Sequence, residues 1–254
     1  MASATAVNNP TNDVLSELVA SRQDGKVHLL LAASGSVATI KIPNIIAALT
    51  AAHPDRLSIR LVLTAAASHF LAGQSAEQPT LQALRALPGV DAIYQDEDEW
   101  GAPWRRGAAI LHIELRRWAD LMAVVPLGAN TLAKIANGLC DNLLTSVVRA
   151  WDAGGAGGGV DGDGRPRKRI LVAPAMNTAM WLHPITARQI RVLAEDWGVR
   201  EAGAGGGDDG GSGWFEVLRP QEKSLACGDV GDGAMKEWTE IVRIIEARLG
   251  LAST

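Results

Sequence analysis

Three segments of the chain carry side chains that could do chemistry, and the first holds a histidine. His112 lies within residues 111–117, just ahead of a predicted strand, so we expect it near the rim of a sheet. An imidazole there can transfer a proton near neutral pH, although it could also serve only as a cap or as packing. The other histidines show no spacing that indicates a metal, and no metal site is expected. They are His28, His53, His69 and His183.

The second segment, PAMNTAMW at residues 174–181, places Asn177 directly after a predicted strand. Ligands of open sheets bind at the carboxyl ends of the strands. The amide of Asn177 can donate to a carboxylate without adding charge. Lysine or arginine would instead stabilise the ionised carboxylate with a counter-charge. Asn177 is therefore a candidate carboxylate-binding residue.

The third segment is a loop with spaced glycines at residues 225–235, and it carries Cys227. Such a loop can close over a substrate and bring in a thiol as an acid, but it can equally be a surface turn. The only other cysteine is Cys140, which excludes a disulfide framework and the paired spacing of a zinc site. A reducing compartment fits this cysteine usage.

Ser34, Gly35, Ser36 and Val37 connect the first predicted strand to a helix. Backbone N–H groups in such a turn form an anion site, although glycine and serine can be needed for turn geometry alone. The dinucleotide pattern G-x-G-x-x-G is absent here, which disfavours NAD.

Short apolar runs alternate with helical patterns along the chain, and this alternation predicts an α/β fold with a doubly wound parallel sheet. The predicted strands are residues 27–33, 58–63, 121–125 and 170–173, and the predicted helices are residues 39–52, 130–137, 142–151 and 186–197. We expect residues 1–25 to be a flexible tail and residues 26–250 to form one domain. Glycine-rich stretches at 153–164 and 202–213 predict flexible surface insertions.

Composition supports a folded, globular chain of 254 residues, because 47% of the residues are hydrophobic and 20% are charged. The net charge of -4 argues against nucleic-acid binding. The basic residues 165–169 are interrupted by Pro166 and are expected to be a solvated entry to the next strand. Without an apolar run of roughly 20 residues, no membrane partner is expected and the cytoplasm is the predicted location.

The order of these motifs resembles the phosphopantothenoylcysteine decarboxylases, relatives of the plant and fungal halotolerance flavoproteins. The resemblance extends over residues 27–245. It rests on residues 32–37, 96–100, 112–120, 129–131, 138–142, 174–181 and 225–235.

The resemblance implies a flavodoxin-like homotrimer that binds FMN where subunits meet and decarboxylates 4'-phosphopantothenoylcysteine to 4'-phosphopantetheine in coenzyme A synthesis. His112 of one subunit would be the base for oxidation, and Asn177 and Cys227 of another would hold the carboxylate and supply a proton for reduction. Lys41 and Arg117 would anchor the substrate phosphate, with Ala226 and Met235 also contacting substrate. The implied FMN contacts are Gly35, Ser36, Val37, Thr64, Gly128, Ala129, Asn130, Thr131 and Ala175.

The chain departs from the family pattern at three positions. Gly128 stands where the family usually has serine, and Ala66 and Ala67 replace hydroxyl residues that help to hold FMN, so we expect weaker flavin binding. One alternative is a regulatory flavin-binding subunit that inhibits a phosphatase or joins a catalytic paralogue in a mixed trimer. Another is a peptidyl-cysteine decarboxylase. Joint presence of His112, Asn177 and Cys227 favours a complete enzyme.

Overall fold

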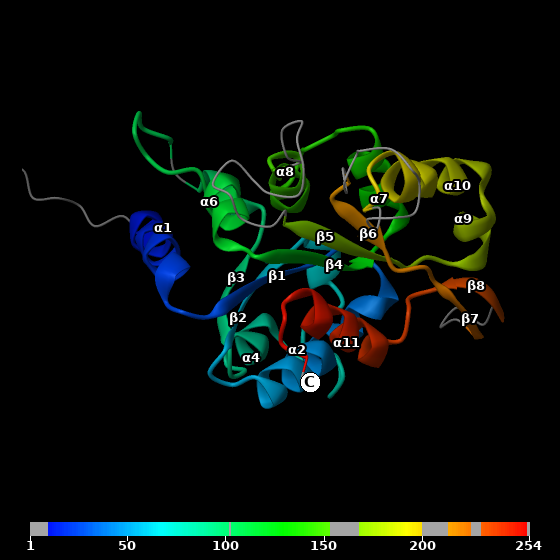
Figure 1. Ribbon diagram of the computed structural model, residues 1–254, viewed down its shortest axis with the longest axis horizontal. Coiled ribbons are helices and arrows are strands. Elements are labelled where there is room, and N and C mark those ends of the chain that lie inside the picture. The colour runs from blue at the N-terminus through cyan, green and yellow to red at the C-terminus, as the bar shows by residue number, and fades with distance from the viewer. Residues whose placement is uncertain (1–9, 102, 153–167, 200–212, 225–229, 253–254) are drawn as a thin grey trace, which may run out of the picture.

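Six parallel strands form the central sheet of the computed structural model, which describes residues 10–101, 103–152, 168–199, 213–224 and 230–252. The strand order is β3-β2-β1-β4-β5-β6, the doubly wound, Rossmann-type order (Figure 1). This confirms the predicted fold class. The strands are β1 (Val27–Ala33), β2 (Leu57–Leu63), β3 (Val90–Tyr94), β4 (Leu121–Leu127), β5 (Arg169–Pro174) and β6 (Phe215–Val217).

The strand order reverses direction between the paired strands β1 and β4. β1 pairs with β2 on one side, where Val27 faces Leu57, and with β4 on the other, where Leu29 faces Leu121. The chain then continues outward in opposite directions from these two central strands. The turns that follow β1 and β4 therefore separate and leave a crevice at the carboxyl edge of the sheet.

Helices cover both faces of the sheet, which explains the nearly continuous apolar runs of the strands. In β1, Leu29 and Leu31 pack against the helices of the first face, while Leu30 and Ala32 pack against the helices of the second face (Figure 1). The helices of the first face are α2 (Ile42–Ala52), α4 (Leu81–Arg85) and α11 (Trp238–Arg248). Those of the second face are α1 (Pro10–Ala20), α6 (Leu111–Trp118), α7 (Ala129–Ala136), α8 (Leu143–Arg149) and α10 (Pro184–Arg191).

Short elements at the carboxyl edge complete the architecture. The 3-10 turn η2 (Val37–Lys41) leads into α2, and α3 (Ala65–Ser68) and α5 (Glu97–Trp100) follow β2 and β3. Helix α9 (Thr178–Leu182) follows β5 at this edge. The π-helical turn η3 (Val192–Asp196) extends the other end of α10, beside the start of β6. An antiparallel hairpin of β7 (Gln221–Ser224) and β8 (Val230–Ala234) precedes α11.

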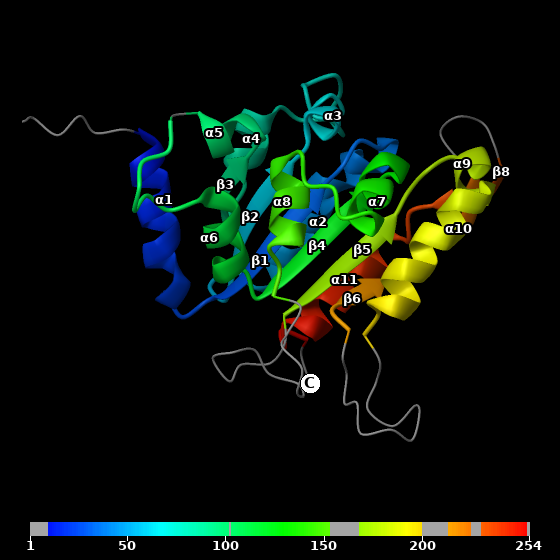
Figure 2. The same ribbon diagram turned by 90° about the horizontal axis from the view of Figure 1, so that it is seen from above.

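The prediction of a flexible tail over residues 1–25 is wrong for residues 10–23. Helix α1 and the 3-10 turn η1 (Ser21–Gln23) occupy this segment, and α1 packs against α6 (Figure 2). Leu18 is fully buried in the core of the second face, and Arg22 forms an ion pair with Glu114 of α6. Apolar burial and this ion pair hold a segment whose polar composition suggested disorder.

The two glycine-rich stretches fall almost entirely outside the described residues. Along the described chain, no helix combines the length and apolar character that crossing a membrane requires.

Candidate functional site

The crevice between β1 and β4 contains a cavity of about 460 Å³, here called the first cavity. Its walls come from the turn after β1, the start of α7, the turn after β5 and the chain around β8. Sequence analysis predicted several of these residues: Gly35, Ser36, Val37, Lys41, Gly128, Ala129, Ala175, Asn177 and Met235. The fold therefore brings together residues that are far apart in the sequence.

A second cavity of about 300 Å³ meets the first at Gly35 and Gly128, which line both. It is lined by Thr64, Asn130 and Thr131, which the family resemblance implies as cofactor contacts. Its remaining lining residues are Ser34, Ala65, Ala66, Asp96, Lys134, Asp141 and Asn142.

Ser34 joins the two strand ends between the cavities. Its hydroxyl donates to the carbonyl of Pro126 at 3.1 Å and accepts from the N–H of Gly128 at 2.7 Å. A Cβ on Gly128 would lie 2.8 Å from the carbonyl oxygen of Gly35, so serine at this position would require a backbone shift. This close approach is a physical reason for the departure at Gly128.

Asn177 is the N-cap of α9, and its side-chain oxygen accepts from the N–H of Met180 at 2.9 Å. Because a backbone N–H can only donate, this bond fixes which end of the amide is the oxygen. The Nδ2 group has no hydrogen-bond partner among the described residues. Its two hydrogens are therefore available to a ligand in the first cavity.

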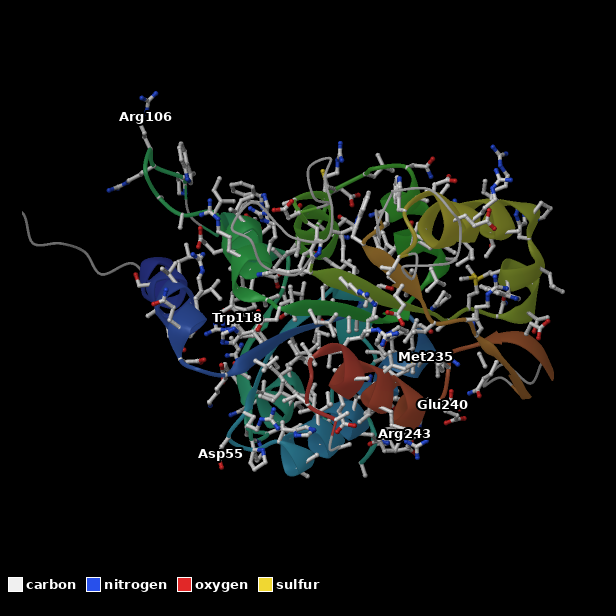
Figure 3. The ribbon with its side chains drawn as sticks, viewed as in Figure 1. Asp55, Arg106, Trp118, Met235, Glu240 and Arg243 are labelled. Atoms are coloured by element: carbon white, nitrogen blue, oxygen red, sulfur yellow. The ribbon has the colours of Figure 1, made fainter. Side chains whose placement is uncertain are left out.

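The β7–β8 hairpin closes one side of the first cavity. The N–H of Met176 donates to the carbonyl of Gly233 at 3.0 Å, and Gln221 donates to the carbonyl of Met235 at 3.0 Å. Met235 is buried and belongs to the short segment that connects β8 to α11 (Figure 3). Strand β8 replaces part of the loop expected at residues 225–235, while the predicted residues Ala226 and Cys227 lie outside the described residues.

Lys41 lines the first cavity as predicted and forms an ion pair with Glu77, with Nζ and Oε2 3.4 Å apart. Both side chains are substantially exposed, so this pair contributes little stability and Lys41 can turn to a ligand.

Thr64 lines the second cavity, but its hydroxyl oxygen accepts from the N–H of Ala67 at 3.2 Å as the cap of α3. At the rim of this cavity Lys134 donates to Asp141 at 2.7 Å. This hydrogen bond from Lys134 holds the pKa of Asp141 below its ordinary value.

His112 lies in the first turn of α6, ahead of β4, and lines neither cavity. In both ribbon views α8 and α7 separate α6 from α9, which begins after Asn177 (Figure 1, Figure 2). A single chain therefore does not bring His112 and Asn177 together.

The structure does not place Arg117 beside Lys41 within one chain. Arg117 donates to Glu114 at 2.9 Å, and its carbonyl accepts from Lys168 at 3.0 Å. Lys168 directly precedes β5, so Arg117 lies toward the amino edge of the sheet, opposite the cavities. The sequence could not show this, because α6 was not predicted as a helix with a defined direction.

Sequence reasoning missed several residues that line the first cavity. They are Ala38, Ile40, Phe70, Met176, Met180, Gln221, Gly233, Ala234, Lys236, Glu237 and Trp238. The strand-end rule could have indicated Met176 and Met180, which flank Asn177. No local signal indicated Phe70, which reaches the cavity through tertiary packing.

A doubly wound α/β protein with two joined cavities at its switch point is built to bind a nucleotide-like cofactor at the carboxyl edge of the sheet. The chain belongs to the Flavoprotein family, whose model matches residues 17–250. This confirms the kind of family that the motifs indicated.

Two relatives and two solved structures illustrate the similarity. Phosphopantothenoylcysteine decarboxylase of Arabidopsis thaliana is 42% identical over 212 residues, covering 84% of this chain and 80% of that protein. Coenzyme A biosynthesis protein 3 of Saccharomyces cerevisiae is 39% identical over 241 residues, covering 92% of this chain and 35% of that protein. The chain thus spans about a third of the length of this fungal relative.

The solved structure of a PPC decarboxylase mutant complexed with pantothenoylaminoethenethiol matches with a TM-score of 0.65 at 39% identity, covering 87% of this chain and 97% of that chain. The FMN binding protein AtHal3 matches with a TM-score of 0.63 at 39% identity, covering 90% of this chain and 100% of that chain. These similarities agree with the predicted flavodoxin-like fold.

Proposed function

We propose that this chain is an FMN-dependent decarboxylase that converts 4'-phosphopantothenoylcysteine to 4'-phosphopantetheine in coenzyme A synthesis. The observation that carries the proposal is the Nδ2 group of Asn177 at the first cavity, which has no partner among the described residues, in a chain of the Flavoprotein family. The names of the relatives in Arabidopsis thaliana and Saccharomyces cerevisiae support the substrate and the pathway.

The residues around the two cavities fit FMN. Leu132 is the first residue of α7 whose N–H bonds back into the helix, to Gly128 at 2.9 Å. The N–H groups of Ala129, Asn130 and Thr131 therefore have no intrahelical acceptor and can bind an anionic or carbonyl group. A Cβ on Gly35 would lie 2.6 Å from the Cβ of Ala66, so the turn after β1 can approach α3 this closely only with glycine at position 35. Bound FMN supplies the electron sink that a cysteinyl carboxylate lacks.

Asn177 would bind the carboxylate that is lost. Its neutral amide orients the carboxylate by hydrogen bonding but gives it no counter-charge. No ion pair therefore has to be broken when the carboxylate leaves as CO2. Lys41, at the same cavity, would bind the substrate phosphate.

We propose that His112 reaches this site from a neighbouring subunit of a homotrimer. The separation of α6 from α9 within one chain supports a site completed by a second copy. So do the exposed apolar side chains Met180, Leu182 and Ile185 beside Asn177. Arg117 would contact the substrate phosphate only if it too came from a neighbouring subunit. Cys227 would supply the proton for the reductive step.

The direct test is to purify the chain, record its flavin spectrum and measure CO2 release from 4'-phosphopantothenoylcysteine. Colourless, inactive protein would refute the proposal. Mixing the inactive variants His112→Gln and Asn177→Asp and allowing subunit exchange should restore about one quarter of the sites. In a closed ring of three, each site would take His112 from one subunit and Asn177 from its neighbour. Random mixing leaves both residues intact at about one quarter of the sites. No recovery would exclude a shared site.

The regulatory alternative is not favoured, because the similarity extends to solved decarboxylase structures and the residues for the reaction are present. A cytoplasmic location and a mixed trimer with a paralogue remain predictions. A peptidyl-cysteine decarboxylase would act equally well on substrates without the phosphate, which the Lys41 variant described below distinguishes.

A further inference from the structure

We propose that Glu99 is a positioning residue that holds the ring of His112 in a single tautomer and leaves Nε2 free as the proton acceptor. The inference deepens the proposed function and rests on it for the role of His112. Glu99 belongs to the acidic segment at residues 96–100, which has no role in the proposed reaction as described so far.

The contact between the two side chains fixes the direction of the hydrogen bond. Oε1 of Glu99 lies 3.0 Å from Nδ1 of His112. A carboxylate can only accept, so the hydrogen must be on Nδ1. In the neutral imidazole Nε2 then carries the lone pair, and it has no hydrogen-bond partner in the described part of the chain. The imidazole keeps 21% of its surface exposed, so Nε2 remains open to a reacting group.

The backbone around Glu99 is held in place by its acidic neighbours. Asp98 accepts from the N–H of Gln95 at 2.7 Å, and Asp96 accepts from the N–H of Leu143 at 3.0 Å. These bonds attach α5 to the end of β3 and to the start of α8. Glu97 is exposed, whereas only 3% of the Glu99 side chain is exposed and its carboxylate faces α6.

A purely structural role explains Glu99 poorly. Its second oxygen, Oε2, is buried and has no partner among the described residues. Burying a carboxylate with one oxygen unpaired costs free energy, and an apolar side chain of similar length would avoid that cost. Stability alone therefore favours methionine here, while control of the His112 tautomer requires an acceptor.

The test compares Glu99→Met with the exposed control Glu97→Gln on the same helix. Nitrogen-15 NMR of labelled histidines reports the tautomer, and the His112→Gln spectrum assigns the signal. We expect hydrogen on Nδ1 in the wild type and in the control, and a shift toward hydrogen on Nε2 in Glu99→Met. Bleaching of bound flavin in a single turnover should be about 10- to 100-fold slower in Glu99→Met, with unchanged flavin content.

A wild-type tautomer with hydrogen on Nε2, or an unchanged tautomer in Glu99→Met, would overturn the proposal. So would bleaching as fast in Glu99→Met as in the control. If Glu99→Met does not fold, the wild-type tautomer alone decides. If wild-type protein shows no bleaching, the proposed function fails, and the tautomer comparison still decides the role of Glu99.

Discussion

The backbone N–H of Met176 donates to the carbonyl oxygen of Gly233 at 3.0 Å, and this bond connects the turn of Asn177 to strand β8. Gly233 has a φ of 122°, and a Cβ there would lie 2.7 Å from the carbonyl oxygen of Met176. The two segments approach so closely that only glycine fits between them.

Gly233→Ala should therefore destabilise the protein by at least about 1 to 3 kcal/mol and weaken flavin binding, because both strained backbone and a steric overlap are introduced. Urea unfolding and flavin titration measure the two effects. Gly25→Ala is the matched control, since Gly25 also has a positive φ but has nothing within 4 Å of the added Cβ. Equal losses in the two variants would contradict the role of the Met176 contact.

Ser34→Ala should cost about 1 to 3 kcal/mol, because it leaves the buried N–H of Gly128 without an acceptor. Loosening of Gly35 and Gly128 should also speed flavin dissociation, which stopped-flow fluorescence can follow. The exposed Ser75→Ala should change stability by less than about 0.5 kcal/mol. Flavin release at the wild-type rate in Ser34→Ala would argue against Ser34 as the link between the cavities.

Asn177→Asp should separate folding from catalysis. The carboxylate can still accept from the N–H of Met180 and cap α9, but it cannot donate and it repels the substrate carboxylate. We expect near-wild-type melting temperature with at least about a 100-fold loss of kcat/KM. Asn177→Ala should lose both the cap and activity. Substantial turnover by Asn177→Asp would remove Asn177 from the reaction.

Lys41→Gln should raise KM for the phosphorylated substrate by about 10-fold or more and leave kcat/KM for the dephosphorylated analogue nearly unchanged. The Glu77 pair is exposed, so stability should change little. Steady-state kinetics with both substrates provide the test, and Lys26→Gln at the opposite edge serves as control. An equal effect on both substrates would mean that Lys41 does not read the phosphate.

Asp141 should make the protein slightly acid-sensitive. Hydrogen bonding to Lys134 lowers the pKa of Asp141 in the folded state. The pair therefore stabilises the protein fully at pH values above the ordinary aspartate pKa, and this contribution is lost as the pH falls through the lowered pKa. The side chain is 62% exposed, so the effect is small. Wild type and Lys134→Met should differ in urea midpoint near neutral pH and converge as the pH falls through the lowered pKa of Asp141. A constant difference across this range would contradict the assignment.

Sequence patterns predicted the central sheet well, because its inner strands are buried on both faces and appear as unbroken apolar runs. β1 begins and ends at the predicted residues. β3 escaped prediction because exposed Asp91 interrupts its apolar pattern, and β6 because it has only three residues. Helix α1 was missed because its stability comes from contacts with α6 rather than from its own composition.

The candidate site was predictable where chemistry coincides with a strand end, as at Gly35 and Asn177. It was not predictable where tertiary packing decides the position. The contact between Glu99 and His112 joins the ends of two short helices, and the location of Arg117 depends on the direction of α6. Neither follows from the spacing of residues along the chain.

The walls of the first cavity extend in sequence from Gly35 to Trp238, which has a consequence for biosynthesis. During translation the cavity cannot close until β8 and the start of α11 have left the ribosome, and its long-range contacts form late in folding. Acquisition of flavin colour would therefore report that synthesis of the domain is complete, and chains stalled before Gly233 should remain colourless.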